Sequence, residues 1–443
     1  MAKDINQLIK DCLEYISENR PQNDWVSYSG PILDDDEYAA ALRVILQDWS
    51  KNWLIFGKKA REFELEFPKY LGTKFGSYTN SGSSANLLAI SSLTSKSGFN
   101  LPKGSKVLTP VVCFPTTLNP IIQSGLKPVF VDVTLPDLNL DLDQTEELLK
   151  KDPDIRAIVF AHVLGNPPDM ERVMMLVDQY DLVFIEDACD ALGSFYDGQK
   201  LGSFGHISTC SFFPAHHMTT GEGGFVATNR SKLRKSIASL RDWGRACYCN
   251  TSKPGSVIDG TACGNRFKNW LVGMPDTTYD HRYVFDEIGY NLKPLDIQAA
   301  IGLEQLKKLP YLEASRRKNF DKLQEIFSKY EDYFHLPQAT EKSDPCWFAY
   351  LLTVKKGSPF TRQQFVDFLE ENKIQTRSYF SGNILAHPGY NHLADEYEDI
   401  QKEFPIATYS TINSFFLGTY AGINDEKMAY IGEIVDKFFE ERV

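Results

Sequence analysis

Long apolar runs are absent from this chain of 443 residues, and none approaches the roughly 20 residues needed to span a bilayer. Residues 1–19 also lack the basic segment and the apolar stretch of a secretory signal peptide. We therefore expect a cytoplasmic protein with no membrane partner, in which thiols stay reduced. The eight cysteines are accordingly better interpreted as free thiols or metal ligands than as disulfides.

Positive charge is also scarce, since 47 Lys and Arg residues stand against 59 Asp and Glu, for a net charge of −12. A protein of this sign repels phosphate backbones, which argues against a nucleic-acid partner. A nucleotide ligand would instead need local positive groups or helix N-termini. With 42% hydrophobic and 24% charged residues, the composition is that of an ordinary folded protein.

The central part of the chain alternates short apolar runs with helical segments. The runs are rich in β-branched residues and nearly continuous, as strands buried on both faces are. This alternation predicts an α/β domain with a mainly parallel sheet. The expected strands are residues 107–112, 128–133, 155–162, 182–187, 207–213 and 224–228.

We predict three parts along the chain: an N-terminal arm at residues 1–33, a large α/β domain at 34–310, and a small α+β domain at 311–443. The last boundary is placed between a long helix that starts at Pro294 and a second helix over residues 311–330. In the small domain, a capping box of Thr361 and Gln364 predicts the start of a helix.

Two segments have the composition of ligand-binding turns. Gly82, Ser83 and Ser84 precede an apolar helix, whose first N–H groups can hold a phosphate; an ordinary capped helix is the alternative. Asp187 ends a predicted buried strand, where α/β folds bind ligands. A carboxylate there can hold a protonated pyridine nitrogen, or it can simply cap the next turn.

Two adjacent histidines, His216 and His217, precede a glycine-rich turn. Neighbours in sequence point in different directions, so one metal ion cannot easily bind both. A general base fits better, because imidazole titrates near neutral pH. A polar turn without a chemical role is the alternative.

A set of cysteines lies in polar, glycine-rich segments. Four thiolates suit zinc or an iron–sulfur cluster. Their spacing matches neither the common zinc-finger nor the ferredoxin pattern, so unrelated thiols remain an alternative. The four residues are Cys189, Cys247, Cys249 and Cys263.

Taken together and in order, several segments resemble the sugar aminotransferase and dehydratase family of vitamin B6 enzymes. The resemblance is strong over residues 45–310 and looser beyond. It implies the type I fold of PLP-dependent transferases, that of aspartate aminotransferase, and a homodimer. The segments are SGSSANLLA, VVCFPTTLNP, PVFVDV, IEDACDALGS, SFFPAHH, GEGGF, RDWGR and GYNLKPLDIQAAIG.

The resemblance also implies roles for single residues. Phe114 would stack on the cofactor ring, Asp187 would pair with its pyridine nitrogen, and Asp190 would lie near the ring hydroxyl. Asn291 would reach the cofactor across the dimer interface. The cofactor phosphate would be held by Gly82, Ser83, Ser84 and Ser211.

His216 stands where aminotransferases of this family carry the lysine that binds the cofactor, and no lysine occurs between Lys200 and Lys232. A transaminase needs that amine. The resemblance is closest to the 3-dehydratases of CDP-4-keto-6-deoxyhexoses in 3,6-dideoxysugar synthesis, which use pyridoxamine 5′-phosphate (PMP). We therefore expect His216 to remove a proton from the bound cofactor while the nucleotide sugar loses its C3 hydroxyl.

The same resemblance implies a [2Fe-2S] cluster on the four cysteines, supplied with electrons by a separate NADH-dependent flavin/iron–sulfur reductase. Two departures stand out: the gap between Cys249 and Cys263 is long, and Phe213 replaces a tyrosine common in relatives. The alternatives are a cluster-free dehydratase, a sugar aminotransferase and a non-catalytic binding protein on this fold. The sequence does not distinguish CDP, GDP and dTDP as the nucleotide.

Overall fold

The computed structural model describes residues 4–19, 23–48, 55–246 and 266–443. In this part of the chain, the large lobe is built on a seven-stranded sheet of order β1-β9-β8-β5-β4-β2-β3. Strands β3, β2, β4, β5 and β8 run parallel, whereas β9 pairs antiparallel with both β8 and β1. The strands are β1 Phe75–Thr79, β2 Lys106–Pro110, β3 Lys127–Val131, β4 Ile155–Ala161, β5 Val183–Asp187, β8 Ile207–Ser211 and β9 Gly224–Thr228.

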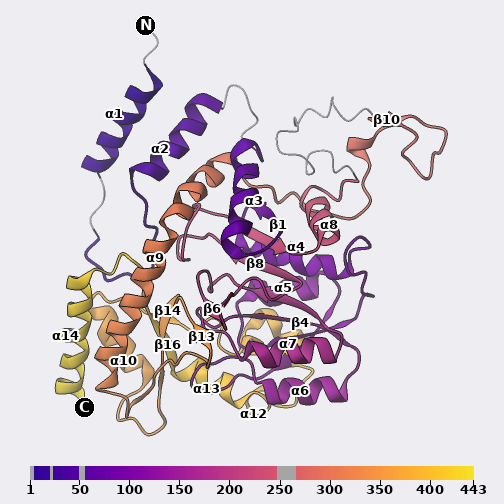
Figure 1. Ribbon diagram of the computed structural model, residues 1–443. Helices are drawn as coiled ribbons and strands as arrows, with labels where there is room; N and C mark the ends of the chain where they lie inside the picture. The colour runs from indigo at the N-terminus through magenta and orange to yellow at the C-terminus, as the bar shows by residue number, and fades with distance from the viewer. Residues whose placement is uncertain (1–3, 20–22, 49–54, 247–265) are drawn as a thin grey trace.

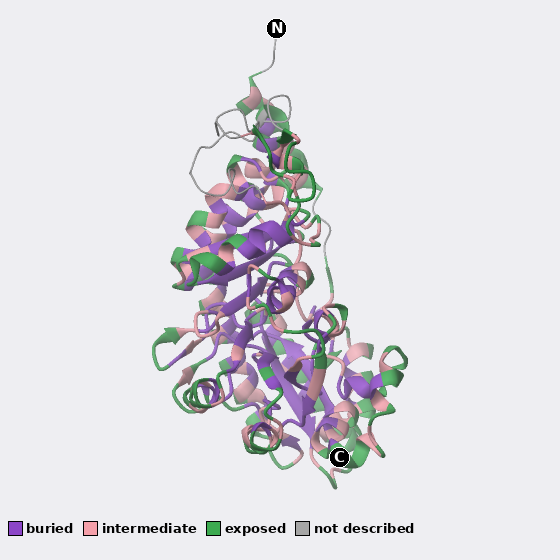
Figure 2. Cartoon of the chain, turned by 90° about the vertical axis from the view of Figure 1, so that its right-hand side faces the viewer, coloured by how far each residue is buried: buried purple, intermediate pink, exposed green. Residues whose placement is uncertain are grey.

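Six of these strands coincide with the predicted apolar runs, which confirms the mainly parallel α/β sheet. Both faces of the sheet are buried, because alternate side chains of one strand enter two different cores, as Val107 and Leu108 do. Figure 2 shows the buried strands running through the middle of the molecule. One face packs on α4 Gly82–Thr94, α5 Pro115–Gln123 and α8 Ser231–Arg241, and the other on α3 Lys58–Leu71, α6 Leu142–Lys151 and α7 Met170–Gln179.

Helix α9, Asp296–Ser328, runs through both lobes without a break (Figure 1). The predicted separate helix at 311–330 is therefore wrong. Pro310 removes one N–H from the helix, but the flanking Leu309 and Leu312 are buried, and their packing keeps the helix continuous. The domain boundary that we predict at residue 310 falls inside this helix.

The small lobe has the predicted α+β composition. Its antiparallel sheet has the order β12-β14-β16-β15 and packs on α10 and α14. Thr361 and Gln364 form the expected capping box at the start of α10. The elements are β12 Phe334–His335, β14 Ala349–Val354, β15 Arg377–Ser378, β16 Ser414–Gly418, α10 Arg362–Glu371, α11 Asn391–Ala394, α12 Ile400–Glu403, α13 Pro405–Asn413 and α14 Asp425–Arg442.

Two small sheets complete the strand pairing in the described ranges. One has the order β13-β6-β7 and joins the lobes; the other is the hairpin β10-β11, which projects from the large lobe (Figure 1). Their strands are β6 Phe195–Tyr196, β7 Gln199–Lys200, β10 Phe267–Lys268, β11 Tyr279–Asp280 and β13 Ser343–Asp344. Every helix in the described ranges is too short or too polar to cross a bilayer.

The N-terminal segment between α1, Ile5–Glu18, and α2, Asp35–Arg43, fastens the two lobes together. Val26 pairs with Ile374 of the small lobe in a parallel bridge. The Ser29 hydroxyl donates to the carbonyl of Ala215 at 2.9 Å, in the turn that carries the two histidines. This segment, residues 23–32, is called the N-terminal strap below.

Candidate active site

Four sequence-distant segments meet at the carboxyl ends of the parallel strands. Asp187 ends β5, and Ser211 ends β8. Gly82 starts α4, directly against Ser211. His216, in the turn after β8, reaches Asp190 in the turn after β5. The structure thus brings Gly82, Ser211, Asp187, Asp190 and His216 to the position where α/β folds bind ligands.

Asp187 is a buried carboxylate held by neutral donors. Its side chain accepts hydrogen bonds from Asn86 Nδ2 at 2.8 Å and Thr117 Oγ1 at 2.9 Å, and from the backbone N–H of Cys189 at 3.2 Å. No Lys, Arg or His of the described residues lies within ion-pair distance of it. A buried carboxylate without a cationic partner fits the protonated nitrogen of a pyridine ring.

The N-terminus of α4 is built for close approach of an anion. Ser81 caps the helix, accepting from the Ser84 N–H at 3.1 Å, and no acidic residue occupies the first turn. A Cβ added to Gly82 would collide with Ser211, lying only 2.5 Å from its Oγ. Ser83 in the same turn is exposed. Helix dipole, free N–H groups and small side chains together fit a phosphate group.

We predict that Gly82→Ala lowers the affinity for PMP by at least about tenfold, because the added methyl group pushes α4 away from Ser211. Titration of the protein with PMP, followed by protein fluorescence, measures the change. Gly432→Ala is the matched control, since its Cβ would make only ordinary contact, 3.5 Å from Ile326. Equal affinities for Gly82→Ala and the native protein would contradict the prediction.

His216 keeps access to the site, with its side chain 16% exposed. Its Nδ1 lies 3.2 Å from Asp190 Oδ1, close enough for an ion pair but outside hydrogen-bond alignment. The ring also packs on Phe348, with the two centroids 5.4 Å apart. Because Nδ1 faces a carboxylate, Nε2 is the nitrogen left to exchange a proton.

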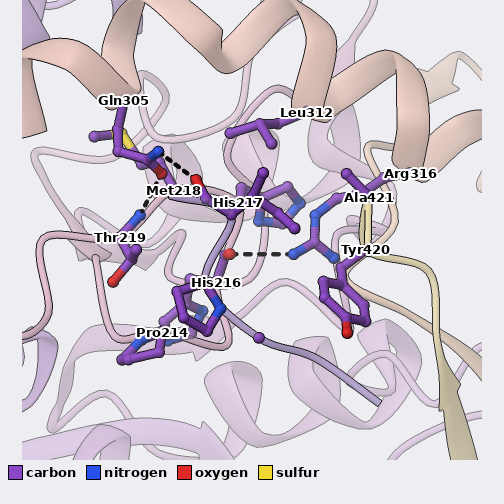
Figure 3. Close-up of a pocket in the computed structure, with 13 residues that line it drawn as sticks. Pro214, His216, His217, Met218, Thr219, Gln305, Leu312, Arg316, Tyr420 and Ala421 are labelled. Atoms are coloured by element: carbon purple, nitrogen blue, oxygen red, sulfur yellow. Dashed lines mark hydrogen bonds between the residues drawn. The ribbon is translucent and has the colours of Figure 1, made fainter. Parts of the chain in front are cut away.

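His217 points the other way, as expected for sequence neighbours. It is buried, and its Nε2 donates to the carbonyl of Cys346 at 2.7 Å (Figure 3 shows its place beneath α9). Burial, and then the charge of Arg316, lower the pKa of His217 well below its ordinary value. His217 is therefore a neutral packing residue, and His216 is the one that faces the site.

This pKa shift predicts a pH-dependent stability. Below about pH 6.5 the unfolded chain takes up a proton on His217 that the folded chain refuses, so stability falls as the pH falls. In His217→Asn the free energy of unfolding should fall less steeply between pH 7 and pH 5, by at most about 1.4 kcal/mol per pH unit. Urea unfolding at several pH values measures this slope, with the exposed His392→Asn as control. An unchanged slope would contradict the prediction.

The other predicted residues that the structure describes are Phe114, Asn291 and Cys189. Phe114 caps α5 with a half-exposed ring, edge-on to Phe380, and is free to stack on a ligand. Asn291 is exposed, and its backbone pairs with that of Asp242 in an isolated antiparallel β-bridge. Cys189 is partly exposed, and burial nevertheless raises the pKa of its thiol.

The other three predicted cluster ligands, Cys247, Cys249 and Cys263, lie outside the described residues. Within the ranges that the structure describes, no group of three or more His, Cys, Asp and Glu side chains is arranged to hold a metal ion. The cluster therefore stays a prediction.

Sequence reasoning missed the side chains that hold the site in place. Asn86 and Thr209 form a chain to Asp187, because the Thr209 hydroxyl donates to Asn86 Oδ1 at 2.5 Å. Arg316 binds the backbone of the histidine turn from α9. The available signal for Asn86 was an amide in a helix whose other polar side chains are all hydroxyls. An arginine in a long amphipathic helix gave no such signal.

The sheet, the N-terminus of α4 and the buried Asp187 define the aspartate aminotransferase fold, which solved sugar-nucleotide enzymes with bound PLP share. The chain belongs to the DegT/DnrJ/EryC1/StrS aminotransferase family, whose sequence profile matches residues 34–436.

Two relatives and one solved structure illustrate this membership. The chain is 42% identical over 412 residues, 93% of this chain and 86% of the relative, to dTDP-4-dehydro-2,6-dideoxy-D-glucose 3-dehydratase of Saccharopolyspora spinosa. It is 41% identical over 403 residues, 90% of each chain, to lipopolysaccharide biosynthesis protein RfbH of Salmonella typhimurium. The E. coli GDP-4-keto-6-deoxy-D-mannose-3-dehydratase with bound hydrated PLP superposes with a TM-score of 0.77 at 28% identity, over 93% of this chain and 99% of that one.

Proposed function

We propose that this chain is a sugar-nucleotide 3-dehydratase that uses PMP to remove the C3 hydroxyl from a nucleoside diphosphate 4-keto-6-deoxyhexose. The observation that carries the proposal is His216, which occupies the turn after β8 and stands 3.2 Å from Asp190. No lysine lies between Lys200 and Lys232, so the turn offers no amine for transamination. Relatives named as 3-dehydratases support the same reaction.

The described residues fit the cofactor. Asp187 would hold the pyridine nitrogen, and Phe114 would cover one ring face. The N-terminus of α4, with Gly82 against Ser211, would hold the phosphate. Bound there, PMP supplies an amine for the C4 ketone and a ring that withdraws electrons, which is the chemistry that loss of the C3 hydroxyl needs.

His216 acts as the general base in this proposal. Its Nε2 would accept the proton that is removed from the cofactor. Asp190, whose carboxylate faces Nδ1, would stabilise the resulting imidazolium by its negative charge. The ring of Phe348 limits the orientations of the imidazole. The role resembles that of a histidine oriented by a carboxylate in other general-base pairs.

We further infer that Cys189, Cys247, Cys249 and Cys263 hold a [2Fe-2S] cluster, which would pass electrons from an NADH-dependent flavin/iron–sulfur reductase. The inference rests on the sequence resemblance. In the same way we propose a homodimer in which Asn291 reaches the partner's cofactor, and CDP as the nucleotide. The relatives are named for dTDP and GDP sugars, so the nucleotide is decided by the assay below.

The function is tested by incubating the PMP-loaded protein with CDP-, GDP- and dTDP-4-keto-6-deoxyglucose, with and without NADH and a flavin/iron–sulfur reductase as the electron source, and analysing the products by mass spectrometry. A product that has lost the C3 hydroxyl is expected, with one nucleotide preferred. Replacement of the ketone by an amine, with glutamate present, would instead identify an aminotransferase. Absence of any spectral change or product would favour a non-catalytic binding protein.

The cluster is tested by anaerobic purification and reconstitution with iron and sulfide. About two irons per chain and broad visible absorption are expected for a [2Fe-2S] protein. Both should disappear when Cys247 and Cys249 are changed to serine. A colourless protein without iron would overturn the electron-transfer part and leave a cluster-free dehydratase.

A further inference from the structure

Arg316 is a buried cation directly behind the histidine turn. It lies on α9 with only 3% of its surface exposed, and no carboxylate of the described residues comes within ion-pair distance of it. Burial lowers its pKa to about 10. Keeping such a charge unpaired is unfavourable unless its donors are satisfied in another way.

Those donors are satisfied by main-chain oxygens. Nη2 donates to the carbonyls of His216, at 3.1 Å, and Ala215, at 3.4 Å, as the dashed line in Figure 3 marks for His216. Nη1 donates to the carbonyl of Phe348 at 2.9 Å. One guanidinium therefore connects the turn after β8 to the residue that leads into β14.

Both connected residues define where the imidazole lies. The carbonyl that Arg316 holds belongs to His216 itself, and the ring of Phe348 packs on the His216 ring with centroids 5.4 Å apart. A further constraint on the imidazole is Asp190, whose Oδ1 lies 3.2 Å from Nδ1 of His216. The planar, forked guanidinium binds carbonyls in two fixed directions, whereas the three donors of a lysine ammonium radiate from one atom on a flexible stem.

We propose that Arg316 is a positioning residue for His216, setting the orientation of the imidazole relative to Asp190 by holding the main chain at positions 215, 216 and 348. The proposal rests on the proposed function of His216 as the base. Displacing a catalytic group by about 1 Å costs on the order of 100-fold in rate, so loss of Arg316 should act mainly on kcat.

The test compares Arg316→Met and Arg316→Lys with Arg317→Met. Arg317 is the matched control, because it binds Asp344 and the Gly193 carbonyl on the outer side of α9. We expect Arg316→Met to lower kcat by about 100-fold with KM nearly unchanged, and Arg316→Lys to recover only part of the rate. Arg317→Met should stay within about twofold of the native rate.

A second readout does not depend on activity. The imidazole carbon–proton NMR signal of His216 is assigned by its loss in His216→Asn, among the eight histidines of the chain. In the protein without substrate, Arg316→Met should shift or broaden this signal, and Arg317→Met should leave it in place. If the native protein has no dehydratase activity, the proposed function fails, while this signal still decides whether Arg316 positions the ring.

An unchanged His216 signal in folded Arg316→Met, or a rate within twofold of native, would overturn the proposal. If Arg316→Met does not fold, Arg316→Lys carries the test, since it keeps the buried charge but not the planar fork that binds the carbonyls of 216 and 348. The His216 signal should move in Arg316→Lys as well. A signal at its native position in folded Arg316→Lys would then overturn the proposal.

Discussion

Replacing His216 by asparagine is expected to lower the rate of C3 dehydration by about 10³-fold while leaving the affinity for PMP nearly unchanged. The reason is that asparagine has no basic nitrogen, whereas the groups that fit the cofactor, Asp187 and the α4 N-terminus, remain in place. Single-turnover assays with PMP-loaded protein measure the rate, and fluorescence titration measures the affinity.

His217→Asn is the natural control for that experiment. His217 is buried and bonded to the Cys346 carbonyl, so its loss should reduce stability but spare most of the rate at neutral pH. If His216→Asn kept the full rate, or if His217→Asn were the more damaging change, the assignment of the base would be wrong.

The second large effect is expected for Asp187→Asn, which should weaken PMP binding and lower the rate, each by about 100-fold or more. In the proposed site Asp187 would hold the pyridine nitrogen in its protonated form, and an asparagine has no charge with which to do so. The donors Asn86 Nδ2 and Thr117 Oγ1 would also lose a charged acceptor, which weakens two buried hydrogen bonds.

Absorbance titration with PMP, together with the dehydration assay, measures both losses. Asp395→Asn, an exposed change of the same chemistry, serves as control and should behave like the native protein. Retained affinity in Asp187→Asn would show that the cofactor nitrogen binds elsewhere.

The fold was predictable where the local pattern and the tertiary packing agree. The parallel strands are buried on both faces, so their apolar runs are unbroken in sequence. Strand β1 was missed because its residues Phe75–Thr79 mix glycine with hydroxyl groups. Gly76 is small there because the ring of Phe225 fills the space beside it, which is a contact between distant strands. The opposite error occurred at Pro310, where two separate helices were predicted. Packing outweighs the hydrogen bond that Pro310 loses, so α9 is continuous.

The charged and glycine-rich residues of the candidate site were predictable from the sequence, but the side chains that hold them in place were not. Asp187, His216 and Gly82 sit at strand ends and turns, where sequence signals are local. Their supports act over long separations: Asn86 reaches Asp187 across 101 residues, and Arg316 reaches His216 across 100. Such pairings depend on how elements far apart in the sequence pack together, which a single sequence does not encode in any short motif.

The N-terminal strap has a consequence for how this protein is made. Residues 23–32 are synthesised early, yet Trp25 accepts from Lys427 Nζ, Val26 pairs with Ile374, and Ser29 binds the histidine turn. Contacts of such sequence separation form slowly, because a long loop must close first. The strap therefore cannot make all of these contacts until residue 427 has left the ribosome, and a nascent chain spends its synthesis without a finished candidate site.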